Sequence, residues 1–395
     1  MRLSPRSGVL LALLLAAAVV GGLPALAQMP FASFGARPAG LGGAAVALTD
    51  DPSGFIDNPA LLSPQGGVWA TSLGVGSVST NGFVSHLDGV TGRSRAELAA
   101  GSAEGPEVRA SLAGLATPGT AVLGDSRYGI VAASSGWGLA VVQTGWSSAV
   151  ARTDLVHVSA GTDPATSFLA NDSRIAFRAL TLQDIAVTRV FGFGSAFVIG
   201  VTGHYLRGTT GVKEESAFTT DVGRLETFAR RGASGGAERT RSRFSWDVGA
   251  EVTIGFLRLG GVMKGVNRPQ FPFEGASAPP EDAGTSVVVG RQTRVGAMAA
   301  IPGTRLVLAA DVDLSKNETL ADSLPSRNVG GGLEIGIGAF AVRGGASVNV
   351  EAPNRPLVWS GGLGFISGTF RAEVSATYRS NDGALGGVVS IRAGN

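Results

Sequence analysis

Residues 35–63, GARPAGLGGAAVALTDDPSGFIDNPALLS, combine closely spaced glycines with acidic side chains, and such a combination could bind a phosphate or a metal ion. A phosphate loop surrounds the anion with backbone N–H groups, and it reads G-x-G-x-x-G or ends in G-K-[ST] after a strand. Neither pattern occurs here, and no predicted strand precedes the segment. The segment is therefore not predicted to bind a phosphate.

The acidic residues Asp50, Asp51 and Asp57 could bind calcium. A calcium loop needs more oxygen ligands at alternating positions and usually a bidentate glutamate, and the segment offers no such set. Asp50 and Asp51 instead precede Pro52, which is typical of a helix start, where aspartate caps and proline occupies the first turn. We expect a short helix or turn from Pro52 to Asp57 that ends before Pro59.

Other residues that could do chemistry are scattered. His86, His157 and His204 are far apart in the sequence, and none belongs to an H-E-x-x-H pattern, so a zinc site is not expected. The stretches GVGSVS (74–79) and GASGG (232–236) do not fit the G-x-S-x-G spacing of a serine nucleophile. We expect no catalytic residues, no metal, no cofactor and no enzymatic activity.

Residues 1–27 have the three parts of a secretory signal peptide. A positively charged start with Arg2 and Arg6 is followed by an apolar run over 8–23 and by Ala25-Leu26-Ala27, which matches an A-x-A cleavage site. The alternative is a transmembrane anchor, but the run is short for one. We expect cleavage near Ala27 and export of the mature chain.

The composition limits what the mature chain can be. Without Arg2 and Arg6, 30 basic residues face 30 acidic ones, which gives no support for a nucleic-acid partner. The chain has no cysteine, and no apolar run long enough for a membrane-spanning helix follows residue 27. The 60 glycines among 395 residues are about twice the usual ~7% share, which favours many strands and turns.

Several stretches alternate apolar and polar residues over the length of a membrane-spanning strand. In FSWDVGAEVTI (244–254) every even position is apolar, whereas the odd positions are polar, charged or glycine; 304–315 and 369–379 show the same alternation. Strands of 10 or 11 residues fit the ~25 Å apolar band of an outer-membrane barrel, whereas strands of soluble sandwiches are usually shorter. The apolar face would then contact lipid, and the charged face would line the lumen.

The connections between these stretches alternate between tight glycine turns and longer loops, as in transmembrane barrels. This rhythm predicts an all-β fold, a transmembrane antiparallel β-barrel of about fourteen strands with both termini on one side. The predicted strands are 68–78, 127–134, 136–158, 174–191, 195–208, 241–254, 256–267, 286–300, 304–315, 327–337, 339–349, 357–366, 369–379 and 384–393.

Two long loops, 86–126 and 209–240, contain short helical stretches and could fold over the barrel mouth, dip into it or remain at the surface. Charged residues of the strands are expected to line the lumen and to pair across neighbouring strands or border a polar path. They are Asp247, Glu251, Arg258, Lys264, Asp311, Arg371 and Glu373.

Residues 35–63 resemble the N-terminal signature of FadL-type outer-membrane proteins and of their PorV/PorQ-like and plasmid-transfer TraF-like relatives. The signature reads roughly G-x-R-x-x-G-M-G-G-A-x-x-A-x-x-D-D-x-S-A, then N-P-A-G-L. The matching residues are Gly35, Arg37, Gly40, Gly42, Gly43, Ala44, Ala47, Asp50, Asp51, Ser53, Asn58, Pro59 and Ala60. Leu41, Gly54 and Leu61 depart from the signature. Stretches at 257–273, 293–318 and 328–335 are most similar to the TraF-like branch.

The resemblance implies a fourteen-stranded outer-membrane barrel whose N-terminal segment lies in the lumen as a plug or hatch. The expected division is a signal peptide over 1–27, a plug over 28–66 and a barrel over 67–395, in a Gram-negative-type outer membrane. The expected plug residues are Arg37, Gly40, Gly42, Gly43, Asp50, Asp51, Asn58, Pro59 and Ala60.

Two functions remain open. The first is passive transport of hydrophobic small molecules, which predicts an apolar pocket beneath the long loops and a lateral gap in the wall, for which Gly330 to Gly332 could supply a kink. The second is a structural or secretion- or conjugation-associated barrel that binds a protein partner without transport. The expected partners are outer-membrane lipid and either a hydrophobic small-molecule ligand or a protein of a secretion or transfer system.

Overall fold

The computed structural model describes residues 33–48, 52–62, 67–194, 196–220, 237–273, 285–317, 319–321, 324–352, 355–379 and 385–394. The predicted signal peptide, with its cleavage site near Ala27, lies outside these residues. Among them, no helix is both long and apolar enough to cross a membrane.

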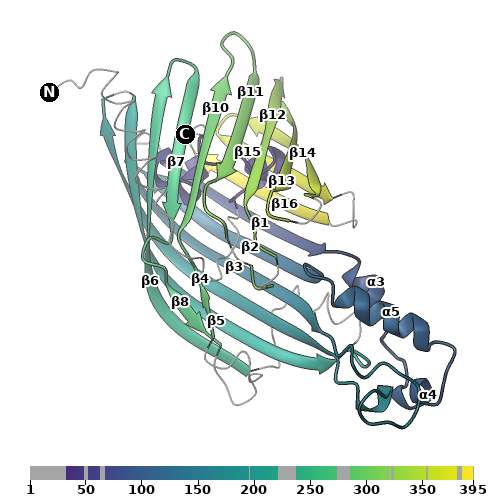
Figure 1. Ribbon diagram of the computed structural model, residues 1–395. Helices are drawn as coiled ribbons and strands as arrows, with labels where there is room; N and C mark the ends of the chain where they lie inside the picture. Colours follow the sequence, from purple (N-terminus) through teal and green to yellow (C-terminus); the bar gives the residue numbers. More distant parts are fainter. Residues whose placement is uncertain are drawn as a thin grey trace.

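Across the described residues, fourteen antiparallel strands close into one barrel, in which β1 pairs with both β2 and the last strand, β16 (Figure 1). The strands are β1 (Gly67–Ser79), β2 (Ala121–Ser134), β3 (Trp137–Arg152), β4 (Arg174–Phe193), β5 (Phe197–Ser216), β6 (Ala237–Ile254), β7 (Leu257–Lys264), β10 (Gln292–Ala300), β11 (Leu306–Asp313), β12 (Asn328–Ile337), β13 (Phe340–Asn349), β14 (Leu357–Ser367), β15 (Phe370–Arg379) and β16 (Leu385–Gly394). The predicted barrel of about fourteen strands is confirmed.

One predicted loop is shorter in the structure. β5 continues to Ser216 and β6 begins at Ala237, so the prediction of a loop over 209–240 was wrong at both ends. The hydroxyls of Thr209 and Thr240 lie 2.9 Å apart across this extension, so polar residues here pair between strands. The pattern suggested a loop because strand residues beyond the lipid no longer need an apolar face. Residues 221–236, where a helix was expected, lie outside the described residues.

Other strand boundaries also differ from the prediction. The stretch 286–300 divides into β9 (Ser286–Val288), which pairs with β8 (Gln270–Pro272), and the barrel strand β10. β2 begins at Ala121, so the first long loop ends earlier than 126, and β3 ends at Arg152 where the prediction continued to 158.

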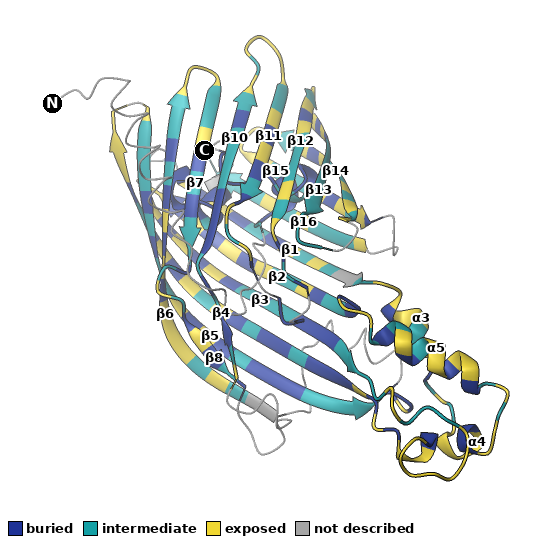
Figure 2. Cartoon of the chain, viewed as in Figure 1, coloured by how far each residue is buried: buried dark blue, intermediate teal, exposed yellow. Residues whose placement is uncertain are grey.

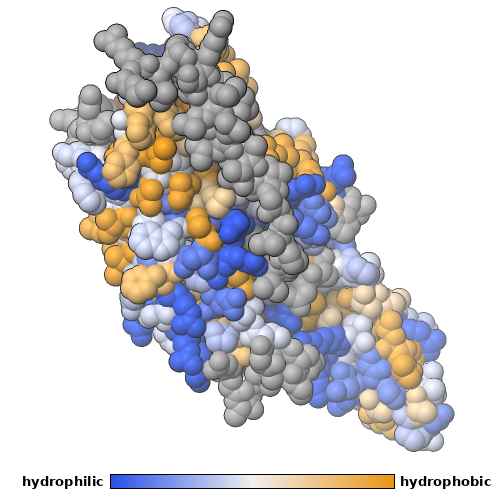
Figure 3. All heavy atoms as spheres, turned by 60° about the vertical axis from the view of Figure 1, so that its left-hand side comes forward, coloured by the Kyte–Doolittle hydropathy of each residue, from blue (hydrophilic) through white to orange (hydrophobic). Residues whose placement is uncertain are grey.

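The barrel wall is apolar outside and polar inside. Along β6 the side chains of Phe244, Trp246 and Val248 are exposed, whereas the intervening Ser245 and Asp247 are buried. The same alternation of exposed and buried residues follows most strands (Figure 2). Hydrophobic side chains gather over the upper wall in Figure 3, and hydrophilic side chains gather below them. The upper part is therefore the region suited to lipid contact.

The wall is uneven in height. β4 and β5 have 20 residues each, whereas β7 and β11 have 8. Twenty residues span roughly 65 Å at about 3.3 Å per residue, far more than the ~25 Å apolar band. The long strands β3 to β6 therefore project beyond the membrane at the end opposite to the short hairpins, toward the bottom of Figure 1.

The connection from β1 to β2 forms most of an outer helical unit, residues 81–119 together with 153–173. It contains α3 (Phe83–Asp88), α4 (Arg95–Ala99), α5 (Gly105–Leu115) and the short η3 (Phe168–Ala170). Its buried Phe83, Leu112 and Phe168 share one cluster with Ile175 and Phe177 of β4. These β4 residues lie on the outward face, because they share the parity of the exposed Ile185 and Val187. The helical unit therefore packs against the outward face of the projecting wall.

The opposite, inward face of the projecting wall is covered by two other connections. Phe271 of β8 packs against Leu180 and Leu206 on the inner side of β4 and β5. Ala321 and Leu324, in the connection from β11 to β12, pack against Ala121 and Val150 on the inner side of β2 and β3. These two connections narrow the outer mouth of the lumen.

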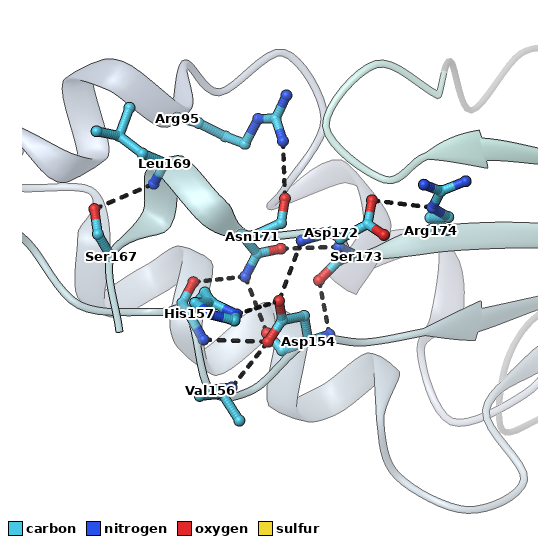
Figure 4. Close-up of polar contacts among 10 residues, drawn as sticks. All are labelled: Arg95, Asp154, Val156, His157, Ser167, Leu169, Asn171, Asp172, Ser173 and Arg174. Atoms are coloured by element: carbon cyan, nitrogen blue, oxygen red, sulfur yellow. Dashed lines mark hydrogen bonds and ion pairs between the residues drawn. The ribbon is translucent and has the colours of Figure 1, made fainter. Parts of the chain in front are cut away.

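A polar network fixes the part of the helical unit that connects β3 to β4 (Figure 4). The Asp154 carboxylate accepts hydrogen bonds from the backbone N–H groups of Val156 and His157, both at 3.1 Å, and its Oδ2 lies 2.6 Å from Nδ1 of His157. The side-chain amide of Asn171 donates to the carbonyls of Asp154 and His157. Although partial burial opposes ionisation, these hydrogen bonds hold the pKa of Asp154 below its ordinary value.

Replacing Phe83 by alanine should unfold the helical unit locally and leave the barrel intact. Phe83 is fully buried, and removing such a ring costs about 3–5 kcal/mol. Trypsin should then cleave within 81–119 much faster than in the native protein, whereas the barrel should keep its heat-modifiable migration on gels. Val84→Ala, at a neighbouring exposed position, is the control. Equal cleavage of the two variants would contradict the described packing.

The Asp154 network should survive mild acid. A lowered carboxylate pKa gives stability that is present above the unfolded value of about 3.9 and is lost as pH falls through the folded value. Pepsin, normalised to a reference peptide, should therefore cleave 153–173 slowly at pH 4 and rapidly only at lower pH, whereas Asp154→Asn should be cleaved rapidly throughout. Asp88→Asn, an exposed carboxylate of α3, should behave as the native protein. Rapid cleavage of the native loop already at pH 4 would contradict the network.

Candidate functional site

The described part of the N-terminal segment, residues 33–48 and 52–62, lies against the inward-facing side chains of the wall. It begins with α2 (Ala36–Gly40) and ends with two 3-10 helices, η1 (Pro52–Ile56) and η2 (Pro59–Leu61). The first 3-10 helix starts at Pro52, where the sequence predicted a short helix. Asn58 caps the second, since its Oδ1 accepts a hydrogen bond from the N–H of Ala60 at 3.0 Å.

A line of four alternating charges attaches α2 to the wall. The guanidinium of Arg37, fully buried, donates from Nε and Nη2 to both carboxylate oxygens of Glu334, at 2.9 and 3.0 Å. Glu334 also pairs with Arg343 of β13, whose Nη2 lies 2.6 Å from Oε1 of Glu373 on β15. Bidentate pairs of this kind fix both distance and orientation.

The inner wall lacks side chains where the segment comes closest. A Cβ on Gly330, Gly332 or Gly345 would lie within 3.0 Å of the backbone of Leu41 or Gly42. Gly42 itself has a φ of +69°, which suits glycine. The bare wall therefore lets two backbones approach each other closely.

The expected kink at Gly330 to Gly332 is absent. These residues pair without interruption with Ala309 to Asp311 of β11 and with Gly345 to Ser347 of β13. The lateral gap predicted at this position was wrong, because these glycines accommodate the N-terminal segment and leave the hydrogen-bond ladder intact.

Carboxylates hold the rest of the segment through its own backbone. Oδ2 of Asp311 accepts hydrogen bonds from the N–H groups of Ala45 and Val46 at 2.7 and 3.1 Å, and Asp57 accepts one from Phe34. Asp57 belongs to the segment and not to a membrane-spanning strand. Burial raises its pKa above the ordinary value, and the positive charge of Lys264 opposes this effect.

A second charged group lies deeper in the lumen, on β4, β5 and β6. Nδ1 of His204 is 2.9 Å from Asp184, and its Nε2 is 3.1 Å from Asp247. These three residues, with Lys264 and Arg127, border a cavity of about 110 Å³. Among the described side chains, no group of three or more acidic, histidine or cysteine residues could hold a metal ion.

A larger cavity of about 330 Å³ separates the segment from the wall at β1, β2 and β13 to β16. Arg127 borders this cavity as well as the smaller one. Arg127 therefore lies between these two cavities, and described residues of the N-terminal segment border both.

The predicted site residues are distributed as follows. Arg37, Gly40, Gly42, Gly43, Asn58, Pro59 and Ala60 lie in the N-terminal segment inside the wall, whereas Asp50 and Asp51 lie outside the described residues. The seven charged strand residues Asp247, Glu251, Arg258, Lys264, Asp311, Arg371 and Glu373 have the inward parity of their strands. Arg258 pairs with Glu251 at 3.3 Å across neighbouring strands, whereas Asp311 contacts the segment.

The sequence reasoning missed several residues of the lumen. Glu334 and Arg343 stand on the polar faces of the predicted strands 327–337 and 339–349, so the alternation could have identified them. Asp125 was assigned to a loop because β2 was predicted to start six residues late. The proximity of Asp184 and His204 depends on the register between β4 and β5, which no local pattern reveals.

Replacing Gly345 by valine should lift the segment from the wall, since a Cβ there would lie 2.5 Å from the backbone nitrogen of Gly42. Overpacking of this kind costs about 1–3 kcal/mol. The chain has no cysteine, so an Ala39→Cys reporter can be labelled selectively, and Gly345→Val should accelerate its reaction with a maleimide about tenfold. Gly344→Val, where a Cβ meets open space, is the matched control. Equal labelling in both variants would contradict the described contact.

Three solved structures similar to this chain are channels or transporters by name. The CymD monoaromatic hydrocarbon channel matches with a TM-score of 0.54 and 12% identity, over 93% of this chain and 98% of that one. The TodX deltaS2S3 mutant monoaromatic hydrocarbon channel matches with a TM-score of 0.52 and 10% identity, over 91% of this chain and 99% of that one. The toluene transporter TbuX of Ralstonia pickettii has a TM-score of 0.49 and 12% identity, over 91% of this chain and 98% of that one. At these identities the likeness to CymD and TodX shows a shared fold.

No curated protein matches the chain by sequence. A family model described as "F plasmid transfer operon, TraF, protein" matches residues 56–313, which is more than half of the chain and extends from η1 to the end of β11. The predicted resemblance to FadL-type and TraF-like barrels is confirmed by the family match and by the shared fold. The chain belongs to the family of the F plasmid transfer operon TraF protein.

Proposed function

We propose that the protein is an outer-membrane barrel through which small hydrophobic molecules pass without an energy source, with the N-terminal segment as a hatch. The observation that carries the proposal is the way the lumen is filled. The segment rests on bare glycines and is held by side-chain polar contacts and by apolar packing of residues such as Phe34, Leu41 and Phe55, whereas cavities of about 330 and 110 Å³ remain beside it. A segment held in this way can move without disturbing the ladder of the wall.

The fold and the surface support this proposal. The chain matches hydrocarbon channels over nearly its whole length and theirs. The exposed apolar residues of the wall fit an outer membrane, and the outer mouth is bordered by apolar side chains of β4, β5 and β8. We assign no catalytic role to the charged groups of the lumen described above, because Arg37, Glu334, Arg343 and Asp311 hold the segment and the wall together.

A second candidate is a barrel that binds a protein partner of a secretion or transfer system. The outer helical unit favours it, since this unit stands beyond the lipid on a wall that is longer than a channel requires. The family description, which refers to plasmid transfer, also favours it. The two candidates differ in whether molecules cross the barrel.

The Arg37→Ala variant tests the hatch in liposomes that contain the purified barrel. The substitution removes two charge-assisted hydrogen bonds, each worth about 1.5–3 kcal/mol, and leaves Glu334 paired with Arg343. Uptake of toluene into the liposomes should rise at least about tenfold over the native barrel, because the segment leaves the wall more often. Arg258→Ala, which breaks an inner ion pair with Glu251, should leave uptake unchanged. Uptake by Arg37→Ala no faster than in empty liposomes would exclude transport and favour the protein-binding candidate.

A further inference from the structure

The larger lumen cavity has an unusual lining for a hydrocarbon site. Its volume of about 330 Å³ falls within the range of small-molecule pockets. Glycine, serine and threonine form most of its border, including Gly74, Gly76, Gly386, Ser72, Ser360 and Thr377. The charged side chains among its described lining residues are Asp125 and Arg127, neighbours on the inward face of β2.

Asp125 is the distinctive residue of this cavity. Among the described residues its carboxylate has no hydrogen-bond or ion-pair partner, and its side chain is exposed within the lumen. It lies opposite Gly76 of β1 in the ladder, and a Cβ on Gly76 would lie 2.7 Å from Oδ1 of Asp125. The bare glycine therefore provides the space in which the carboxylate lies.

Arg127 compensates this charge only in part. It interacts electrostatically with Asp57, Asp184 and Asp247 as well as with Asp125. Its guanidinium also stacks over the ring of Phe34, 5.5 Å from the centroid. Asp184 and Asp247 also contact His204, and Asp57 lies near Lys264. Of the four carboxylates, Asp125 is the one that borders the larger cavity.

We propose that this cavity binds a small molecule with a cationic, hydrogen-bond-donating head, such as a primary ammonium, on a short hydrocarbon body. The head would donate to Asp125, and the body would lie along the glycine backbone, Ala39 and Val388. A hydrocarbon without such a head would cover this carboxylate without giving it a partner, which is unfavourable. This inference rests on the proposed function and narrows its substrate class to amines with an apolar body.

The test compares benzylamine, protonated at pH 7, with benzyl alcohol, its neutral counterpart of similar size. Binding to the full-length barrel in detergent is measured by calorimetry. The native protein should bind benzylamine about tenfold or more tightly than benzyl alcohol, as expected for a charge-assisted hydrogen bond. Asp125→Asn should remove this preference, whereas Asp88→Asn, an exposed carboxylate outside the lumen, should keep it.

A second variant distinguishes loss of the binding site from loss of folding. Gly76→Ala keeps every charge but displaces the carboxylate of Asp125, so it should weaken benzylamine binding and leave benzyl alcohol binding unchanged. Heat-modifiable migration on gels confirms that each variant is a folded barrel. Equal affinities of the native protein for the two probes, or a preference that survives Asp125→Asn, would overturn the inference.

Liposome uptake of toluene separates this inference from the proposed function. If toluene crosses the Arg37→Ala barrel but the native protein does not prefer benzylamine to benzyl alcohol, the proposed transport is supported and the amine site is contradicted. If benzylamine binds through Asp125 and toluene does not cross, the site stands and the proposed passage fails.

Discussion

The pairing of β1 with β16 is the contact on which the rest of the structure depends. In a bilayer, no water satisfies an unpaired backbone N–H or C=O group, so a sheet can cross only when its edges meet. Nine residue pairs, from Val68 with Gly394 to Gly76 with Gly386, close the ladder. Within the membrane, closure turns one face of each strand to lipid and the other to the lumen. The lumen must then be filled by protein or by water.

The N-terminal segment fills part of that space with backbone. Side chains of opposing walls would have to interlock to close a lumen of this width, but here the wall presents glycines and the segment presents small residues. Polar contacts then fix the position. Arg37 reaches Glu334, Asp311 receives two backbone N–H groups, and Asn58 donates to the carbonyl of Val46 at 2.8 Å. Such contacts define one resting position and can be exchanged for others or for water, which agrees with the proposed role as a hatch.

The uneven wall separates two environments. The short strands β7 and β10 to β16 suffice to cross the apolar layer, whereas β3 to β6 continue beyond it and become a platform with two covered faces. The helical unit packs on the outward face, and the connections around Phe271 and Leu324 pack on the inward face. The same strands therefore serve as membrane wall at one end and as the core of an external layer at the other.

The sequence by itself determined the barrel, because strand alternation is local. A stretch such as 244–254 carries its two faces in its own residue types, and glycine turns mark where short hairpins lie. Through the family signature, the sequence also identified Arg37 and Asn58 as residues of the N-terminal segment. It placed seven charged side chains on the inward face of the strands. The limits of this local information appear at β5, β6 and β2, whose outer ends left the lipid and so lost the apolar face that identified them.

Only the tertiary structure decided which inward residues meet. Asp184 and His204 face each other because β4 and β5 pair in one register, and Arg37 reaches Glu334 across 297 positions of sequence. Because they are glycines, Gly330 to Gly332 suggested a kink in the strand, but their pairing with β11 is uninterrupted. The close approach of the backbone of Leu41 and Gly42 accounts for the glycines instead. The physical reason is the same in each case: alternation assigns a residue to a face, whereas barrel closure and strand register assign its neighbours.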